Sequence, residues 1–138
     1  MKLLIKMLIL SAGLISSVAF GGGAIVVAPG SSIGGVDKTA VERVFLGQAR
    51  EIGGVSVTPV NQSEGQAVRE QFEERVLGMT SSRVRSHWSR LIFTGAAQPP
   101  QNLGGDADVK NFVAGNPNAI GYISADSVDA SVRVVLEF

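Results

Sequence analysis

The chain of 138 residues has no cysteine and only one histidine. Without cysteine there can be no disulfide and no lipid-modified cysteine. The lone His87 cannot form a metal site unless carboxylates converge on it, and a nucleophilic dyad would need a serine. No serine lies in a Gly-x-Ser-x-Gly elbow. We therefore expect no enzyme activity, no metal and no cofactor.

Long apolar runs are also scarce, and the most prominent one is at the N-terminus. Two lysines open the chain, residues 3–15 are largely apolar, and Ser17-Val18-Ala19 supplies small residues for a signal peptidase. The run is too short for a comfortable membrane span. We predict a cleaved signal peptide over residues 1–19 and a periplasmic or secreted domain over residues 20–138; an uncleaved anchor is the alternative. That length fits one domain with a core of its own.

The charge of the chain is not biased toward one sign. It has 12 basic and 12 acidic residues, and removal of Lys2 and Lys6 with the signal peptide leaves 10 against 12, a net charge of −2. This balance argues against nucleic-acid binding. It also gives the domain no polybasic attraction to anionic lipid. We expect no membrane span after cleavage of the signal peptide.

The hydrophobic pattern alternates between strands and helices. Strands are predicted over residues 24–28, 55–60, 119–123 and 131–138, with helices after Asp37, after Ser63, after Thr80 or Ser81, and over residues 106–114. This order predicts an α/β fold with a mostly parallel or mixed sheet and helices on both faces. Ligands of such sheets bind outside the carboxyl ends of the strands. We therefore expect the loops after Ala28, Val60 and Ile123 to share one edge.

Three segments, in this order, resemble a known family. They are Val44-Phe45-Leu46-Gly47-Gln48, then Thr58-Pro59-Val60-Asn61-Gln62-Ser63-Glu64 with Arg69-Glu70-Gln71-Phe72, and finally Asn116-Pro117-Asn118-Ala119-Ile120-Gly121-Tyr122. Together they resemble the periplasmic phosphate-binding proteins of phosphate ABC transporters. The resemblance implies one lobe of a type II periplasmic-binding-protein-like fold, because the chain is too short for two lobes. It is the lobe that carries the family's phosphate-contacting Ser-Gly-Thr loop, and Gln66-Ala67-Val68 stand at that loop here.

The segment from Val55 to Phe72 is the first candidate for a binding site. A strand that feeds a capped helix directs free N–H groups at one spot, which favours an anion. Ser63, Gly65 and Gln66 are the candidate ligand residues, and the resemblance adds Asn61. The alternative is a plain helix cap, with Ser63 as N-cap and Gln66 at the capping-box position. In the first turn, Glu64 would suit the helix dipole but would repel phosphate.

Three further residues are weaker candidates. Arg69 could clamp an oxyanion with two hydrogen bonds, although its place directly after Val68 predicts the solvent side of the helix. Ser31 and Ser32 follow the first strand, at the expected ligand edge, and an ordinary polar turn is the alternative.

Two functions remain open at this point. The first is a module that binds phosphate or another small oxyanion in connection with ABC-type uptake. The second is a structural or protein-interaction module of the cell envelope that has lost ligand binding. In that case the face that meets a second lobe in the family would be exposed or covered by another chain, which predicts a homodimer or a periplasmic protein partner. Arg83, Arg85 and Arg90 are interpreted as a solvated helix face, with a partner-binding stripe as the alternative.

Overall fold

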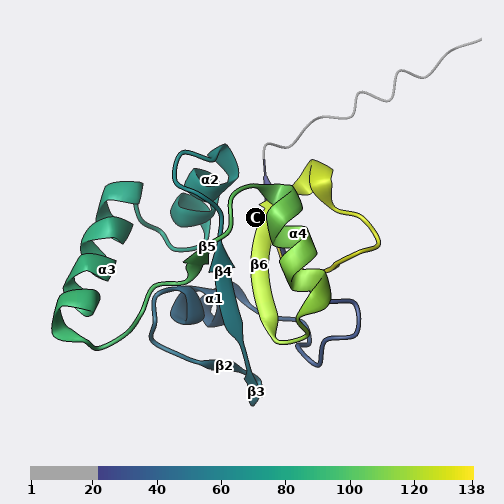
Figure 1. The fold of residues 1–138 in the computed structure, drawn as a ribbon, viewed down its shortest axis with the longest axis horizontal. Coiled ribbons are helices and arrows are strands. Elements are labelled where there is room, and N and C mark those ends of the chain that lie inside the picture. Colours follow the sequence, from purple (N-terminus) through teal and green to yellow (C-terminus); the bar gives the residue numbers. More distant parts are fainter. Residues whose placement is uncertain (1–21) are drawn as a thin grey trace, which may run out of the picture.

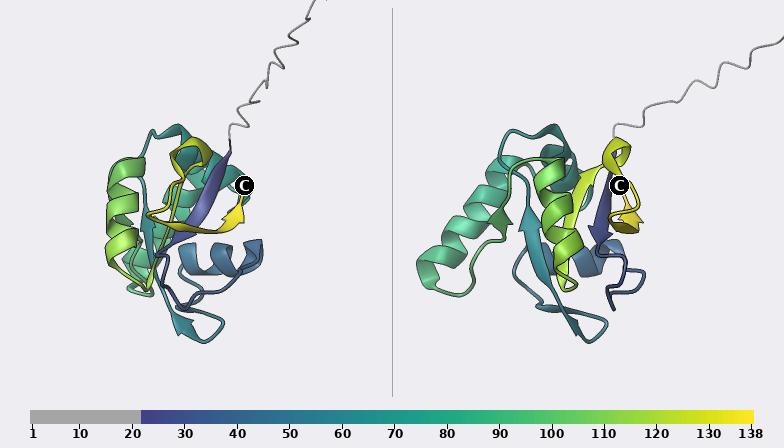
Figure 2. Two further views of the ribbon diagram at one scale, coloured as in Figure 1. Left: turned by 90° about the vertical axis from the view of Figure 1, so that its right-hand side faces the viewer. Right: turned by 45° about the vertical axis from the view of Figure 1, so that its right-hand side comes forward.

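The computed structural model describes residues 22–138, so the predicted signal peptide lies outside the described part of the chain. The helices are α1 (Lys38–Phe45), α2 (Ala67–Arg75), α3 (Ser81–Thr94), α4 (Asp106–Gly115) and the short 3₁₀ helix η1 (Ala125–Ser127). The strands are β1 (Gly23–Val27), β2 (Glu51–Ile52), β3 (Val55–Ser56), β4 (Thr58–Asn61), β5 (Gln101–Asn102), β6 (Ala119–Ser124) and β7 (Arg133–Glu137). Figure 1 and Figure 2 show their arrangement.

The main sheet has five strands in the order β5-β4-β6-β1-β7. Strand β4 is parallel to both β5 and β6, whereas β1 is antiparallel to β6 and to β7. Four of the five strands therefore point the same way and β1 alone is reversed. This confirms the predicted α/β fold with a mixed, mostly parallel sheet.

The reversal of β1 corrects one prediction about the ligand edge. In the register of β1 and β6, Gly23 lies opposite Ser124 and Val26 lies opposite Gly121. The end of β1 therefore lies toward the beginning of β6. The loop after Ala28 is at the opposite edge of the sheet from the loops that follow β4 and β6, and the expectation that all three share one edge is wrong. Periodicity reveals a strand but not its direction.

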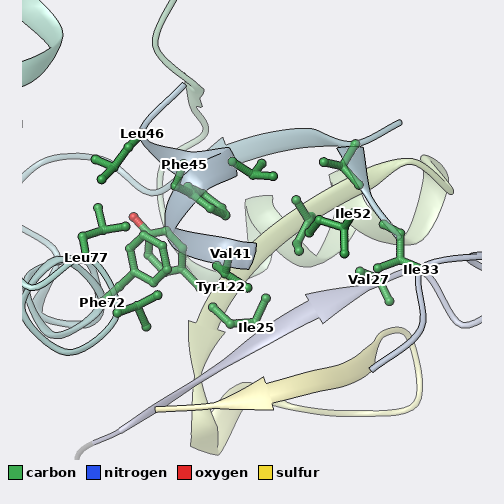
Figure 3. Packing of buried hydrophobic residues seen from close by; sticks show 14 of the residues in the cluster. Ile25, Val27, Ile33, Val41, Phe45, Leu46, Ile52, Phe72, Leu77 and Tyr122 are labelled. Atoms are coloured by element: carbon green, nitrogen blue, oxygen red, sulfur yellow. The ribbon is translucent and has the colours of Figure 1, made fainter. Parts of the chain in front are cut away.

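Apolar side chains on the two faces of the sheet build two cores. Ile25 and Val27 of β1 face α1 and α2, whereas the alternate residues Ala24 and Val26 face α4. Helices on both faces are thus confirmed. Figure 3 shows the larger core, in which the Phe72 ring stacks on the Tyr122 ring at 4.1 Å and meets the Phe45 ring edge to face at 4.8 Å.

Local sequence signals explain three of the helix ends. Asp37 caps α1 by accepting the Ala40 N–H at 2.7 Å, and Thr80 caps α3 by accepting the Arg83 N–H at 3.3 Å. Helix α3 stops at Gly95, which takes the left-handed conformation.

Two strand predictions needed revision. The predicted strand over residues 55–60 is split into β3, which forms a hairpin with β2, and β4, which joins the main sheet. Strand β5 is absent from the predicted strands, because its two exposed polar residues carry no strand signal. Among residues 22–138, no helix combines the length and the hydropathy needed to cross a bilayer.

Candidate functional site

The loop after β4 forms the centre of the candidate site. Two hydrogen bonds join it to the loop after β5. The Leu103 N–H donates to the Asn61 carbonyl at 2.9 Å, and the Ser63 N–H donates to the Gly104 carbonyl at 2.8 Å. Because β4 and β5 are parallel, both loops lie at the carboxyl edge of the sheet. This is the edge at which open α/β sheets bind ligands.

Helix α2 begins later than the sequence predicts. Its N-cap is Gln66, in an extended conformation, and the Gln66 side chain makes no capping hydrogen bond. The prediction of Ser63 as N-cap is therefore wrong. The chain turns at Gly65, which has a φ of 87° that favours glycine, and this turn places the helix start three residues further on.

The late start leaves the beginning of α2 uncapped. The Gln66 carbonyl accepts the N–H groups of Arg69 and Glu70. The N–H groups of Ala67 and Val68 have no hydrogen-bond partner within residues 22–138. Such free N–H groups, together with the helix dipole, attract an anion or a carboxylate.

Charged side chains surround this helix start. Glu64, Gly65 and Arg69 line a hollow together with Ser81 and Arg85 of α3, and the carboxylates of Glu70 and Glu73 also line it. Glu64 and Glu70 are exposed. The hollow therefore holds three carboxylates against two guanidinium groups, a balance that weakens the attraction for an anion.

The side chain of Asn61 points into the protein. Its Oδ1 accepts a hydrogen bond from the Tyr122 hydroxyl at 2.8 Å, and the same hydroxyl accepts the Gln62 N–H at 3.2 Å. Tyr122 is fully buried, and burial raises the pKa of its hydroxyl well above the usual range. Asn61 thus fixes the end of β4 to β6.

Gln62 is 99% buried and ties β4 to the start of α4. Its Nε2 donates to Asp106 Oδ1 at 2.7 Å and to the Tyr122 carbonyl at 3.0 Å. Its Oε1 is a buried acceptor without a partner within the described residues. The Asp106 carboxylate also accepts the Ser124 N–H at 3.1 Å and the Ser127 hydroxyl at 2.5 Å. Burial alone would raise the pKa of Asp106, but these hydrogen bonds outweigh it and lower the pKa.

Arg69 is buried, with 7% of its surface exposed. The prediction that it lies on the solvent side of α2 is wrong. Its Nη1 donates to the Gln62 carbonyl at 2.7 Å and to Asn102 Oδ1 at 3.0 Å, and its Nε lies 3.6 Å from a carboxylate oxygen of Glu73. The guanidinium joins α2 to the ends of β4 and β5, because a planar fork can bridge several acceptors at once.

The structure does not bring Ser31 and Ser32 to this site. They lie at the opposite edge of the sheet, in the loop after β1. The Ser31 hydroxyl accepts the Ile33 N–H at 3.1 Å, and Arg133 donates to the Ser31 carbonyl at 3.0 Å. This is the polar turn that the sequence offers as the alternative reading.

Of the seven residues singled out by the sequence, Asn61, Ser63, Gly65, Gln66 and Arg69 therefore meet in one loop and one helix turn. Ser81 and Arg85, which line the same hollow, were not singled out as ligand residues, because they come from α3 and carry no local signal that links them to this loop. His87 Nε2 lies 2.8 Å from the Leu46 carbonyl, a structural contact. Within residues 22–138 no cluster of three or more histidine or acidic side chains could hold a metal ion.

Solved structures of known proteins share this fold. The chain is similar to an ABC-type phosphate transport receptor from Vibrio cholerae, with 22% identity and a TM-score of 0.64. The matched region covers 83% of this chain and 45% of that chain. It is also similar to a putative phosphate ABC transporter substrate-binding protein with bound phosphate from Clostridium perfringens (23% identity, TM-score 0.66, 83% and 44% covered). A third similar structure is PstS from Borrelia burgdorferi (12% identity, TM-score 0.61, 83% and 46% covered).

No protein-family model and no curated protein matches the sequence. The chain spans less than half the length of the three structures that it resembles. At this identity the similarity shows the fold, which is one lobe of a phosphate-binding-protein-like structure. This confirms the fold that the three sequence motifs imply.

Proposed function

We propose that this protein is a single-lobe relative of periplasmic phosphate-binding proteins that binds phosphate or a similar small oxyanion at the start of α2. It would act outside the cytoplasm, after cleavage of the predicted signal peptide, in connection with ABC-type uptake and not as an enzyme. The observation that carries the proposal is the uncapped start of α2, with the free N–H groups of Ala67 and Val68 at the carboxyl edge of the sheet.

The similar structures support the class of ligand. Two of the three carry a phosphate ABC transport name, and one of these two was solved with phosphate bound. Ser63, Gly65 and Gln66 are the residues that we assign to the site, together with the first N–H groups of α2. Ser63 and Gln66 can offer side-chain donors, and Gly65 gives the anion access to the backbone.

The proposed binding is weak. A single lobe leaves the ligand open to water, whereas tight small-molecule sites bury most of the ligand. The carboxylates of Glu64 and Glu70 oppose an anion, and the charge of Arg69 is balanced by Glu73. We therefore expect a dissociation constant on the order of 1 mM, equivalent to roughly 4 kcal/mol of binding free energy.

A proline substitution tests the assignment directly. Ala67→Pro deletes one of the two free N–H groups, and the first turn of a helix accepts proline. The preceding Gln66 already has the extended backbone that a residue before proline prefers. Titration calorimetry with phosphate should then show affinity reduced about threefold or more, the effect of one lost hydrogen bond.

Lys38→Pro is the matched control, since it deletes the N–H at the first position of α1, which follows the extended cap Asp37 at a distant surface. It should leave phosphate binding unchanged. Glu64→Gln should strengthen binding, because it removes an exposed charge of the same sign as the ligand. Equal affinity for Ala67→Pro and the unchanged protein would contradict the proposed site.

One observation favours the second candidate function, a protein-interaction module. Phe93 at the end of α3 is 93% exposed, and the neighbouring Ile92 is 53% exposed. Adjacent exposed large apolar side chains are unusual on a monomer surface and often mark a contact with another protein.

A further inference from the structure

Helix α3 stands at one end of the molecule, beyond α2, and presents an outer face that no described element covers (Figure 1 and Figure 2). Its inner face carries the buried side chains of Val84 and Trp88. Phe93 lies about half a turn away from Val84 around the helix, since successive residues are about 100° apart. The most exposed large apolar side chain of the described residues therefore points directly away from the protein.

The two ends of α3 differ in their charged surroundings. The helix carries Arg83, Arg85 and Arg90 and no acidic residue, and Arg90 makes no ion pair within the described residues. At the other end of α3, Glu70 and Glu74 of α2 are exposed and line a hollow with Met79 and Arg83. The last turns of α3 thus carry Arg90 with the exposed Ile92 and Phe93, whereas its first turns adjoin the two carboxylates of the hollow beside Arg83.

We propose that the outer face of α3 is the interface of a homodimer, in which two copies of α3 pack antiparallel about a two-fold axis. In this arrangement Phe93 of each copy lies over the first turn of the other copy's α3. Arg90 of each copy faces the acidic hollow formed by the partner's Glu70 and the partner's Glu74. Each copy supplies both halves of the complementary pair, as an isologous interface requires.

The helical geometry agrees with this pairing. Arg83 and Arg90 are seven residues apart, so they lie within about 20° of each other around the helix. Arg83 lines the acidic hollow, and therefore Arg90 lies on the same flank of α3 as the hollow. A two-fold axis perpendicular to two antiparallel helices, and to the line that joins them, places the same flank of each helix on the same side of the interface. Arg90 of one copy consequently meets the flank of the other copy on which two carboxylates, Glu70 and Glu74, outnumber Arg83. Ser82, Ser86 and Ser89 on the outer face allow close approach.

The same charge pattern favours a second copy over a lipid surface. An anionic bilayer would attract the arginines of α3 but would repel Glu70 and Glu74 on the same flank. The interface is small for a stable dimer, since a standard interface buries about 1,600 Å² in total. We therefore expect a dimer with a dissociation constant of about 10 to 100 μM, at the weak end of specific association.

Sedimentation equilibrium of the protein produced from the full 138-residue chain, at concentrations up to about 1 mM, tests the proposal against this expected affinity. The unchanged protein should dimerise. Phe93→Ser should weaken dimerisation about tenfold or more, because it removes an aromatic anchor from both ends of the helix pair. Phe93 is almost fully exposed, so this variant should fold. Val128→Ser, which alters another exposed apolar residue, should have no effect.

A charge exchange tests the arrangement itself. Arg90→Glu, and separately the double variant Glu70→Lys/Glu74→Lys, should each be largely monomeric, because each places like charges opposite each other. An equimolar mixture of the two should form a heterodimer, since both charge pairs are then restored across the interface. A strict monomer at the highest concentration, a dimer unaffected by Phe93→Ser, or binding only to anionic vesicles would each overturn the proposal. The anion site at α2 is tested separately and does not depend on this result.

Discussion

Replacement of Arg69 by methionine is the sharpest test of how the candidate site is held together. Methionine keeps much of the apolar stem but removes the guanidinium that joins the Gln62 carbonyl, Asn102 and Glu73. Glu73 is 4% exposed and would lose its ion pair. Breaking a buried pair by removal of one partner typically costs about 3–5 kcal/mol.

The lower end of that range applies here, because the Ser81 hydroxyl still donates to Glu73 at 2.7 Å. We therefore predict that Arg69→Met lowers the free energy of unfolding by about 3 kcal/mol. Urea denaturation, followed by circular dichroism and by the fluorescence of the single tryptophan, measures this loss. Arg69→Met/Glu73→Leu should recover most of the stability, since the uncompensated charge is then absent.

The result that would refute the reasoning is a small effect. A loss below about 1 kcal/mol is typical of an exposed ion pair. Such a small loss would indicate that Arg69 lies on the solvent face of α2, as its place after Val68 predicts. A double variant less stable than Arg69→Met would likewise show that Glu73 is not left unpaired.

Three further predictions concern β6 and the side chains that contact it. Tyr122→Phe should destabilise the protein by about 2–4 kcal/mol, because it unpairs the buried Asn61 side chain and a buried N–H; urea denaturation against the control Phe93→Ser checks this. Gly121→Ala should cost about 1–3 kcal/mol by thermal or urea unfolding, since its Cβ would lie 2.8 Å from a Val109 methyl carbon, and an unchanged midpoint would contradict the packing. Asp106 has a lowered pKa, so its contribution to stability is present above its ordinary pKa of 3.8 and is lost as the pH falls below that value. Asp106→Asn should therefore flatten the pH dependence of stability below about pH 4, and parallel acid-unfolding curves would exclude this role.

The sequence predicts the fold well where local signals are strong. Asp37 and Thr80 are polar caps before amphipathic stretches, and both cap helices as expected. The motifs around Gly47, Pro59 and Pro117 lead to the same fold that the solved structures show. These features depend on residues close together in the chain, which a sequence displays directly.

The sequence fails where long-range contacts decide. The direction of β1 follows from its pairing with β6 and places Ser31 and Ser32 at the far edge. Arg69 is buried because distant acceptors, among them Asn102, lie within reach of its guanidinium. Similarly, Ser63 loses the capping role because its N–H is bound to Gly104 and the chain turns at Gly65 before the helix begins.

The central claim is that a small oxyanion binds at the uncapped start of α2. The most direct measurement is a titration of ¹⁵N-labelled protein with phosphate, followed by amide chemical shifts at constant ionic strength. The account predicts saturable shifts, with a dissociation constant on the order of 1 mM, at the amides of Gly65, Ala67 and Val68. Absence of saturable shifts, or shifts concentrated at Ser31 and Ser32, would contradict it.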